Sequence, residues 1–255
     1  MPTWNPTQYL QFGNERLRPA LDLLARIPSE TPGTVYDLGC GPGTATVLLE
    51  DRWPDAQITG LDSSDSMLER ARNLSRKITW RTADLSTWKP DAPADVLFSN
   101  AVFHWLDGHE ILFSRLMSAL NPGGVLAIQM PNNFSAPSHT SITETIRSGP
   151  WREQFESGLR EFPVGDASTY YDLLSPHASH LDIWETTYSH ILSGENPVVE
   201  WTKGTALRPF LDQLDEDRAQ SFLDHYSSLI NVAYTQSADG NTVLPFKRVF
   251  IIAVK

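Results

Sequence analysis

The stretch Val35-Tyr36-Asp37-Leu38-Gly39-Cys40-Gly41-Pro42-Gly43-Thr44 joins an apolar strand, a glycine-rich turn and the start of a helix. The glycines at 39, 41 and 43 let the backbone turn sharply and approach a ligand with no Cβ in the way. A helix predicted from Thr44 directs its free N–H groups toward that ligand. The pattern indicates a nucleotide-type cofactor site, although glycine turns also close many ordinary strand-helix junctions.

The next two predicted strands each end in a carboxylate. Residues 56–61 lead into Asp62, about twenty residues after the glycine turn, where an acidic side chain can bind a ribose diol of NAD or of S-adenosylmethionine. The dinucleotide pattern G-x-G-x-x-G fails, because Thr44 stands in the place of its third glycine. Residues 78–83 form a further strand that ends at Asp84. Together these two details favour S-adenosylmethionine.

Four motifs follow one another in a fixed order: Asp37-Leu38-Gly39-Cys40-Gly41-Pro42-Gly43, Asp62-Ser63-Ser64, Ala83-Asp84-Leu85 and Leu120-Asn121-Pro122-Gly123-Gly124. Jointly they resemble class I S-adenosylmethionine-dependent methyltransferases. The resemblance implies that the glycine turn lies against the methionine moiety, that Asp62 binds the ribose hydroxyls, and that Asp84 with Leu85 frames the adenine. Taken singly, Asp62 is also explained as a helix cap and Asp84 as a turn residue. The expected cofactor-binding residues are Asp37, Gly39, Cys40, Gly41, Gly43, Asp62, Ser63, Asp84, Leu85 and Asn100.

Length and composition predict one main domain. A chain of 255 residues with 40% hydrophobic content can bury one substantial α/β core and a modest elaboration. No apolar run is long enough to cross a bilayer, and the first residues show neither a basic segment nor an apolar signal core, so we expect a cytoplasmic protein. The single cysteine, Cys40, excludes an internal disulfide and is interpreted as a packing residue.

The formal net charge of −11 bears on the partners. Nucleic-acid binding draws on many lysine and arginine contacts to phosphates, so a nucleic-acid substrate is disfavoured. A small anionic substrate remains compatible, since a local arginine cluster dominates at short range while distant carboxylates are screened. We therefore expect a small-molecule acceptor, no metal and no membrane partner, with the choice between a monomer and a weak dimer left open.

Hydrophobic periodicity predicts the organisation of the chain. A helix is expected over residues 8–27, and the cofactor-binding core over residues 33–131. From residue 34 to about residue 130 the predicted order is strand, helix, strand, helix, strand, strand, helix, strand, with buried apolar runs. This order predicts an α/β fold with a doubly wound, seven-stranded, mostly parallel sheet. By the crevice rule, its ligand binds outside the carboxyl ends of the strands.

The second half of the chain is expected to be mostly helical. Helices are predicted over residues 138–147, 151–162, 169–178 and 216–234, and strands over residues 181–191 and 246–254. In the resembled family the last two strands pair antiparallel at one edge of the sheet. Residues 131–180 and 194–244 would then form a helical cap.

The segment after the fourth strand places polar and aromatic groups near the methyl group to be transferred. Asn100 ends the strand, and His104 and Trp105 follow. His104 is a candidate general base, but a histidine beside aromatic residues is more often a hydrogen-bonding pocket wall. No acidic motif of the kind seen in amino-group methyltransferases occurs here.

Basic residues beside prolines or aromatics are the candidate anion ligands. A buried guanidinium needs an anionic partner, and its fork matches a carboxylate. Pairing with the protein's own carboxylates is the alternative. The expected substrate-binding residues are Arg208, Arg248, Tyr171, His190, Trp105 and Arg16.

Further motifs extend the resemblance to nearly the whole chain, including the cap. They are Trp4-Asn5-Pro6, Arg52-Trp53-Pro54, Gln129-Met130-Pro131, Tyr170-Tyr171-Asp172, Leu207-Arg208-Pro209 and Arg248-Val249-Phe250-Ile251. They resemble a family of carboxyl O-methyltransferases that esterify the tricarboxylate trans-aconitate. His104 departs from this family, which has a glutamine there.

The resemblance implies in-line methyl transfer to a carboxylate already ionised at neutral pH. No general base is then required, and His104 and Trp105 position the reactants. The alternatives are a carboxyl O-methyltransferase for another di- or tricarboxylate or a carrier-bound malonyl group, and a non-enzymatic S-adenosylmethionine-binding sensor or scaffold.

Overall fold

The computed structural model describes residues 13–159, 161 and 163–255, with side chains from residue 17 onward. Residues 8–12 of the predicted first helix and the Arg16 side chain lie outside this part. The described chain divides into two compact units. The core unit comprises residues 14–131, 163–186 and 248–255, and the cap unit comprises residues 132–162 and 187–247.

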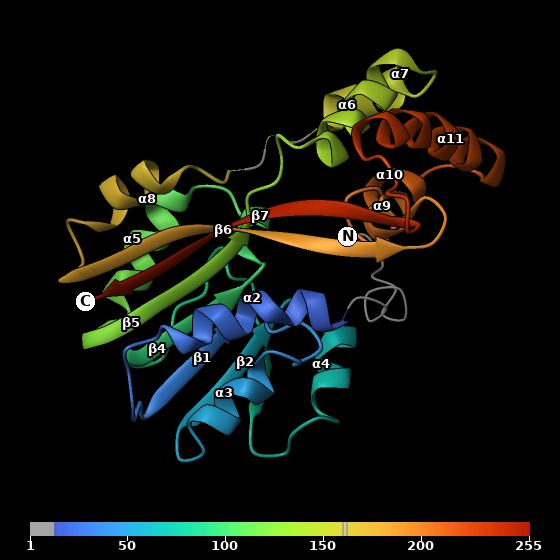
Figure 1. Ribbon diagram of the computed structural model, residues 1–255. Coiled ribbons are helices and arrows are strands. Elements are labelled where there is room, and N and C mark those ends of the chain that lie inside the picture. Colours follow the sequence, from blue (N-terminus) through green and yellow to red (C-terminus); the bar gives the residue numbers. More distant parts are fainter. Residues whose placement is uncertain (1–12, 160, 162) are drawn as a thin grey trace. The chain divides into compact units, whose positions relative to one another are not determined.

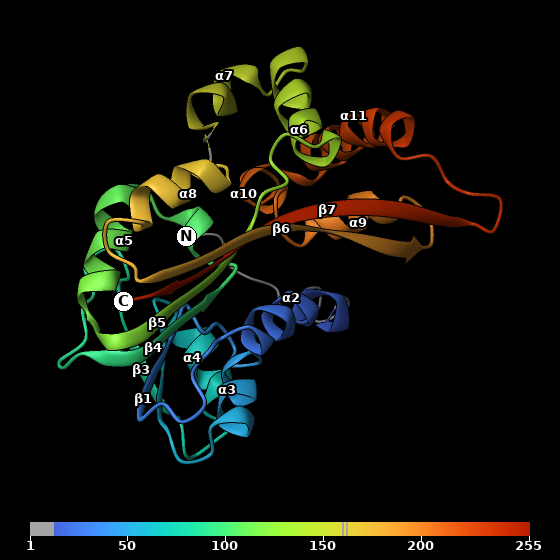
Figure 2. The same ribbon diagram turned by 60° about the vertical axis from the view of Figure 1, so that its left-hand side comes forward.

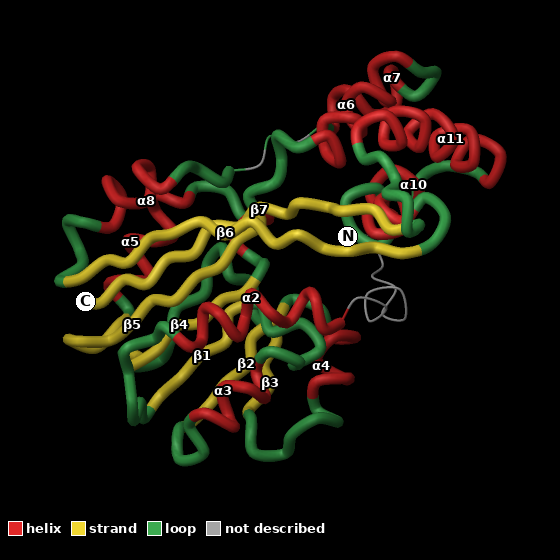
Figure 3. The backbone as a smooth tube through the Cα atoms, in the orientation of Figure 1, coloured by secondary structure: helices red, strands yellow, loops and turns green. Residues whose placement is uncertain are grey.

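A seven-stranded sheet organises the core unit and runs in the order β3-β2-β1-β4-β5-β7-β6 (Figures 1 and 3). The first five strands all run parallel to their neighbours in this order, whereas β7 runs antiparallel to β5. The predicted doubly wound, mostly parallel sheet is therefore confirmed. The strands are β1 Thr34–Leu38, β2 Gln57–Asp62, β3 Thr79–Thr82, β4 Ala94–Asn100, β5 Leu120–Pro131, β6 His180–Ser193 and β7 Asn241–Val254.

Helices cover both faces of this sheet. Helices α2, α3 and α4 lie along one face, and α5 and α8 lie along the other (Figures 1 and 2). On the second face, Phe113, Met130 and Tyr170 belong to one buried apolar cluster with residues of the central strands. The helices are α2 Gly13–Ala25, α3 Thr46–Arg52, α4 Asp65–Ala71, α5 His109–Ser118 and α8 Ala167–Leu174.

The helix after the glycine turn begins later than the sequence indicates. It starts at Thr46 rather than Thr44, because Gly43 has a φ of 85°, which no helical residue adopts. The first helical bond runs from the N–H of Val47 to the carbonyl of Gly43. Helix α2 differs from the prediction at its C-terminal end, since it ends at Ala25 and not at residue 27.

Residues 163–186 belong to the core unit, although the sequence assigned residues up to 180 to the cap. Helix α8 begins at Ala167, because the carboxylate of Asp166 accepts the N–H of Thr169 at 2.9 Å and so caps the helix. The buried Tyr170 and Leu174 pack α8 against the apolar cluster that includes α5.

The cap unit has its own apolar core. Trp151 of this unit packs edge-on against Phe222 with ring centroids 5.0 Å apart, and Leu207 and Tyr226 are buried in the same cluster. Its helices are α6 Pro137–Ser148, α7 Arg152–Phe155, α9 Pro197–Lys203, α10 Arg208–Leu211 and α11 Glu216–Ala233. Helix α11 was predicted almost to the residue.

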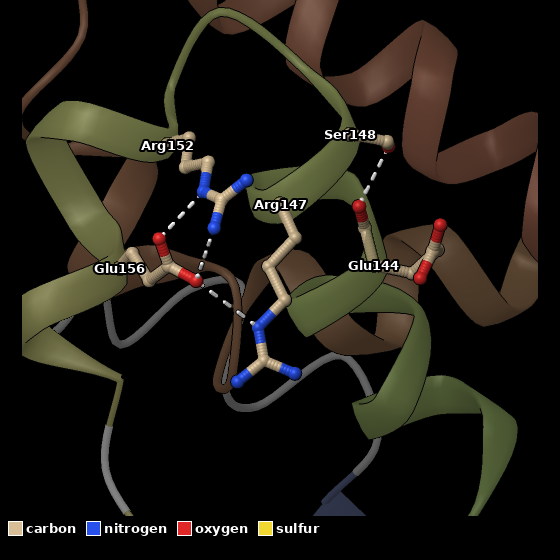
Figure 4. A network of polar contacts seen from close by, with 5 residues as sticks. All are labelled: Glu144, Arg147, Ser148, Arg152 and Glu156. Carbon is tan, nitrogen blue, oxygen red and sulfur yellow. Dashed lines mark hydrogen bonds and ion pairs between the residues drawn. The ribbon is translucent and has the colours of Figure 1, made fainter.

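The helix predicted over residues 151–162 is too long, because α7 ends at Phe155. Helix α7 is followed by a 3-10 turn, Glu156–Gly158, and Leu159 then adopts an extended conformation, because Gly158 supports a helix poorly. Glu156 contacts two arginines, Arg147 of α6 and Arg152 of α7 (Figure 4). Its carboxylate lies 2.6 Å from Nε of Arg152 and 3.5 Å from Nε of Arg147.

Candidate functional site

The glycine turn is fixed to the neighbouring strand by backbone and side-chain bonds. The N–H groups of Gly39 and Cys40 both donate to the carbonyl of Leu61 at 2.8 Å. The N–H of Gly41 donates to Oδ2 of Asp62 at 2.9 Å, and the N–H of Ser64 donates to Oδ1 at 2.9 Å. One carboxylate therefore joins the ends of β1 and β2, and each of its oxygens keeps a lone pair for a further donor.

The three turn glycines differ in what a side chain would meet. A Cβ on Gly39 would lie 2.3 Å from Cγ2 of Val102, and one on Gly43 would lie 2.8 Å from the ring of Trp80. A Cβ on Gly41 would meet no atom within 4 Å. Gly41 thus faces open space at the carboxyl edge of the sheet, which is a cradle in which a ligand can approach the backbone.

Asp37 and Cys40 lie beneath this turn. The buried carboxyl of Asp37 accepts the hydroxyl of Thr46 at 2.6 Å, which ties the end of β1 to the first residue of α3. Burial raises the pKa of Asp37 to about 7. Burial, together with the charges of Asp37 and Asp62, also raises the pKa of the Cys40 thiol. A buried, protonated thiol is unreactive, in keeping with a packing role.

Asp84 and Leu85 form a turn after β3. Oδ1 of the exposed Asp84 accepts the N–H of Ser86 at 2.9 Å and its hydroxyl at 2.7 Å, and these bonds lower the pKa of Asp84. Arg115 of α5 donates to the carbonyl of Leu85 at 2.8 Å and to that of Ser86 at 2.6 Å. The turn is therefore held by α5, which lies on the face of the sheet opposite to α3 and α4.

At the end of β4 the backbone bends sharply. Ala101 has a φ of 59° and donates its N–H to the carbonyl of Gln129 at 2.9 Å. Oδ1 of Asn100 is buried and has no hydrogen-bond partner in the described part of the chain. Such an orphaned acceptor next to the glycine cradle fits an ammonium group of a bound cofactor.

A 3-10 turn, Phe103–Trp105, carries His104 and Trp105 beside this bend. His104 is buried, Trp105 is 38% exposed, and their ring centroids lie 4.7 Å apart. Nε2 of His109 lies 2.9 Å from the carbonyl of Phe103, which only accepts, so Nδ1 accepts the Tyr170 hydroxyl at 3.0 Å. Helices α5 and α8 thus hold the turn in place.

Arg248 is buried on β7, next to Gln129 of β5. Its Nη1 donates to Oε1 of Gln129 at 3.3 Å. Nε2 of Gln129 is buried and has no hydrogen-bond partner among the described residues. An unsatisfied buried donor costs roughly 1–3 kcal/mol and calls for a structural or functional explanation.

The structure distributes the other expected substrate residues over both units. Arg208 of the cap unit pairs with its own neighbour Asp212 at 3.3 Å, and His190 is buried there, stacked on Trp201 at 4.6 Å. Tyr171 of the core unit is 57% exposed on α8. The core unit thus brings together the cofactor motifs, His104, Trp105 and Arg248, but not Arg208 or His190.

Sequence reasoning assigned no role to three residues of this region. Thr46 satisfies the Asp37 carboxyl, and Val102 occupies the space that the absent Cβ of Gly39 leaves. Gln129 contacts Arg248, and its position in the apolar run 125–130 was the available signal, since a buried amide requires partners.

The described residues lack two further features. No group of three or more histidine, cysteine, aspartate or glutamate side chains there is arranged to hold a metal ion. In the same residues, no helix is long and apolar enough to cross a membrane.

Comparisons with known proteins indicate the same class. A family model described as a methyltransferase domain matches residues 35–124. Haemonchus contortus phosphoethanolamine N-methyltransferase 2 in complex with S-adenosyl-L-methionine aligns with a TM-score of 0.58 at 20% identity, over 98% of this chain and 56% of that chain. The YcgJ protein of Bacillus subtilis aligns with a TM-score of 0.61 at 13% identity, over 93% and 98%. The sheet order, the glycine turn and these likenesses show the fold of a class I S-adenosylmethionine-dependent methyltransferase.

Curated relatives give the family. Proteins named trans-aconitate 2-methyltransferase match from Azoarcus sp. strain BH72, at 47% identity over all of both chains, and from Agrobacterium fabrum, at 47% over 99% of each. The protein of that name from Yersinia pestis is 44% identical over 99% of this chain and 98% of its own. The chain belongs to the trans-aconitate 2-methyltransferase family.

Proposed function

We propose that this enzyme transfers the methyl group of S-adenosylmethionine to a carboxylate oxygen of trans-aconitate and so forms a monomethyl ester. The observation that carries the proposal is the similarity to relatives of that name along the full chain, cap segments included. A likeness confined to the cofactor motifs would support only the class of enzyme, because acceptors differ widely within this fold.

In this proposal the glycine turn and Asp62 hold the cofactor. The open space at Gly41 admits the ligand to the backbone, and the free lone pairs of Asp62 accept the ribose hydroxyls. Asn100 accepts from the amino group of the methionine part, and the turn at Asp84 and Leu85 frames the adenine. The bonds from Ser86 and Arg115 support this assignment, since they fix the turn in one conformation.

Arg248 binds a carboxylate of the acceptor that does not react. Arg248 is 5% exposed, and a charge buried to that degree attracts an anion far more strongly than an exposed one. Arg208 is a second candidate on the cap unit, although Asp212 already engages it. Trp105, on its braced turn, is the candidate wall of the acceptor pocket.

The chemistry requires orientation rather than proton transfer. When bound, S-adenosylmethionine supplies an electrophilic methyl group, whose bond to sulfur breaks as the bond to the carboxylate oxygen forms. A carboxylic acid with a pKa near ~4 has lost its proton at neutral pH, so no residue need accept one. The protein's task is to place the oxygen in line with the methyl group and to exclude water.

A methyl-transfer assay on a panel of tricarboxylates and dicarboxylates tests the proposal. We expect trans-aconitate to give the highest kcat/KM and Arg248→Ala to raise the KM for it by about 100-fold, as loss of a buried charge-assisted contact predicts. Higher turnover of a carrier-bound malonyl group would overturn the choice of acceptor. Tight S-adenosylmethionine binding without turnover of any acid would indicate a sensor or scaffold instead.

A further inference from the structure

A chain of buried hydrogen bonds connects helix α8 with the 3-10 turn that carries Trp105. The hydroxyl of Tyr170 on α8 lies 3.0 Å from Nδ1 of His109 on α5. Nε2 of His109 lies 2.9 Å from the carbonyl of Phe103 in the turn. Tyr170, His109 and Phe103 are all buried. Such hydrogen bonds hold their partners more firmly than exposed ones, because water cannot replace either partner.

Each hydrogen bond of this chain has one direction. The carbonyl oxygen of Phe103 only accepts, so Nε2 of the neutral His109 ring carries the hydrogen and Nδ1 carries the lone pair. Tyr170 therefore donates its hydroxyl hydrogen to Nδ1, and burial raises the pKa of this hydroxyl, so the hydrogen stays in place. The hydroxyl oxygen in turn accepts the N–H of Gly165 at 3.2 Å. The sulfur of Met130, 4.0 Å from the hydroxyl, is a weaker and more distant acceptor.

The chain ends on the carbonyl that closes the 3-10 turn. The same oxygen of Phe103 accepts the N–H of Leu106 at 3.0 Å, and the carbonyl of Val102 accepts the N–H of Trp105 at 2.9 Å. His109 thus uses the second lone pair of the Phe103 carbonyl and fixes the plane of the peptide bond that follows it. The orientation of the next residues of the turn depends on this plane.

The two ends of the 3-10 turn lie at two parts of the candidate site. At its start, the side chain of Val102 occupies the space beside Gly39, where a Cβ would lie 2.3 Å from Cγ2 of Val102. At its end, Trp105 is partly exposed and is the candidate wall of the acceptor pocket. A displacement of the turn would therefore move this wall relative to the cofactor site.

We propose that Tyr170 and His109 are positioning residues for methyl transfer. They act through the carbonyl of Phe103, which holds the 3-10 turn against the glycine turn, so that Trp105 keeps the acceptor oxygen in line with the methyl group. A misplacement of about 1 Å can lower the rate of such a reaction about 100-fold. This inference rests on the proposed function, in which Trp105 lines the acceptor pocket.

Tyr170→Phe and His109→Leu test the inference in the full-length enzyme. Tyr170→Phe keeps the ring but removes the donor to Nδ1, and is expected to lower kcat about 10-fold. His109→Leu removes the donor to Phe103 and is expected to lower kcat about 30-fold. The KM for trans-aconitate and the dissociation constant of S-adenosylmethionine should stay within about threefold, because no binding group is lost. If His109→Leu does not fold, Tyr170→Phe decides.

Two further variants show whether the tyrosine acts through the histidine. His109→Gln retains an amide donor for the Phe103 carbonyl and an acceptor for Tyr170, and should recover most of the kcat that His109→Leu loses. The double variant Tyr170→Phe/His109→Leu should be no slower than His109→Leu alone, because residues of one network do not contribute independently. Additive losses in the double variant would contradict positioning through His109.

Tyr226→Phe is the matched control for the loss of a buried hydroxyl. In the cap unit, the hydroxyl of the buried Tyr226 donates to the carbonyl of Ser138 at 2.7 Å. Urea unfolding should show a similar loss of stability in Tyr226→Phe and Tyr170→Phe, whereas only Tyr170→Phe should lower kcat. Equal losses of kcat in the two variants would point to lower stability as the cause and would overturn the inference.

Amide hydrogen exchange over residues 102–106, measured without the acid, separates this inference from the proposed function. We expect the N–H groups of Trp105 and Leu106 to exchange about 10-fold faster in Tyr170→Phe than in the wild type. Unchanged exchange, or faster exchange with a wild-type kcat, overturns the inference. A wild-type protein that does not methylate trans-aconitate contradicts the proposed function, and the exchange rates still test whether Tyr170 holds the turn.

Discussion

The N–H of Gly41 donates to Oδ2 of Asp62 across 2.9 Å, so the glycine turn after β1 and the acidic end of β2 form one unit. The second oxygen of the same carboxylate accepts the N–H of Ser64 at the start of α4. Asp62 therefore shapes the turn in addition to offering lone pairs to a ribose. Substitutions of Asp62 should affect both the conformation of the turn and the binding of the ribose, and these two effects can be distinguished.

We expect Asp62→Ala to weaken S-adenosylmethionine binding by about 100-fold, because two backbone donors and the ribose hydroxyls lose their acceptor together. Asp62→Asn keeps one oxygen and should lose less. Isothermal titration calorimetry measures both. Asp65→Asn serves as the control, since Asp65 lies exposed on α4 and its carboxylate accepts the hydroxyl of Thr82. Equal affinities for Asp62→Ala and the wild type would remove Asp62 from the cofactor site.

Gly39→Ala and Gly41→Ala should differ in their effects on stability and on cofactor binding. The first places a Cβ 2.3 Å from Val102 at a φ of 80° and should destabilise the fold by about 3 kcal/mol. The second meets no neighbouring atom and should cost only about 1 kcal/mol for its left-handed φ, while weakening cofactor binding. Urea unfolding and calorimetry check the two effects. Val102→Ala added to Gly39→Ala should restore part of the stability, and no restoration would contradict the steric explanation.

The buried Asp37 makes stability depend on pH. Its pKa is about 7 in the folded protein and 3.8 in its ordinary state, so the folded state binds the extra proton between these values. The contribution of this carboxyl to the free energy of unfolding is therefore fully present below about pH 4 and is lost as the pH rises to about 7. Asp37→Asn cannot ionise, so its stability relative to wild type should rise across that window, by at most about 4 kcal/mol.

Urea unfolding at pH 4.5, 6 and 8 measures this difference for Asp37→Asn. Asp51→Asn removes an exposed carboxylate from the same region, on α3, and serves as the control. A pH-independent difference between Asp37→Asn and wild type would show that the carboxyl keeps an ordinary pKa in the folded protein.

His104→Gln should keep kcat within about tenfold of wild type, because an ionised acceptor needs no base. For the same reason kcat should stay level between pH 6.5 and 8.5. Steady-state kinetics with a matched S-adenosylmethionine affinity measurement check both expectations. A loss of about 1000-fold in kcat with unchanged cofactor affinity would identify His104 as the general base.

The sequence alone determined the cofactor half of this protein. Glycines 39, 41 and 43, the carboxylates Asp62 and Asp84, and the alternation of apolar strands and helices act locally, since turn conformation and burial patterns depend on near neighbours. The parallel sheet then brings the strand ends to one edge, whatever the details of packing. The predicted order of elements from residue 34 to 130 is accordingly the observed one.

Only the tertiary structure decided which polar side chains meet. The approach of Arg248 to Gln129, 119 residues apart in sequence, follows from the antiparallel register of β5 and β7. Burial also placed His190 among aromatic rings, which no local pattern indicates. The sequence shows which side chains are charged. Whether such a charge can bind a substrate depends on the neighbours that folding brings to it.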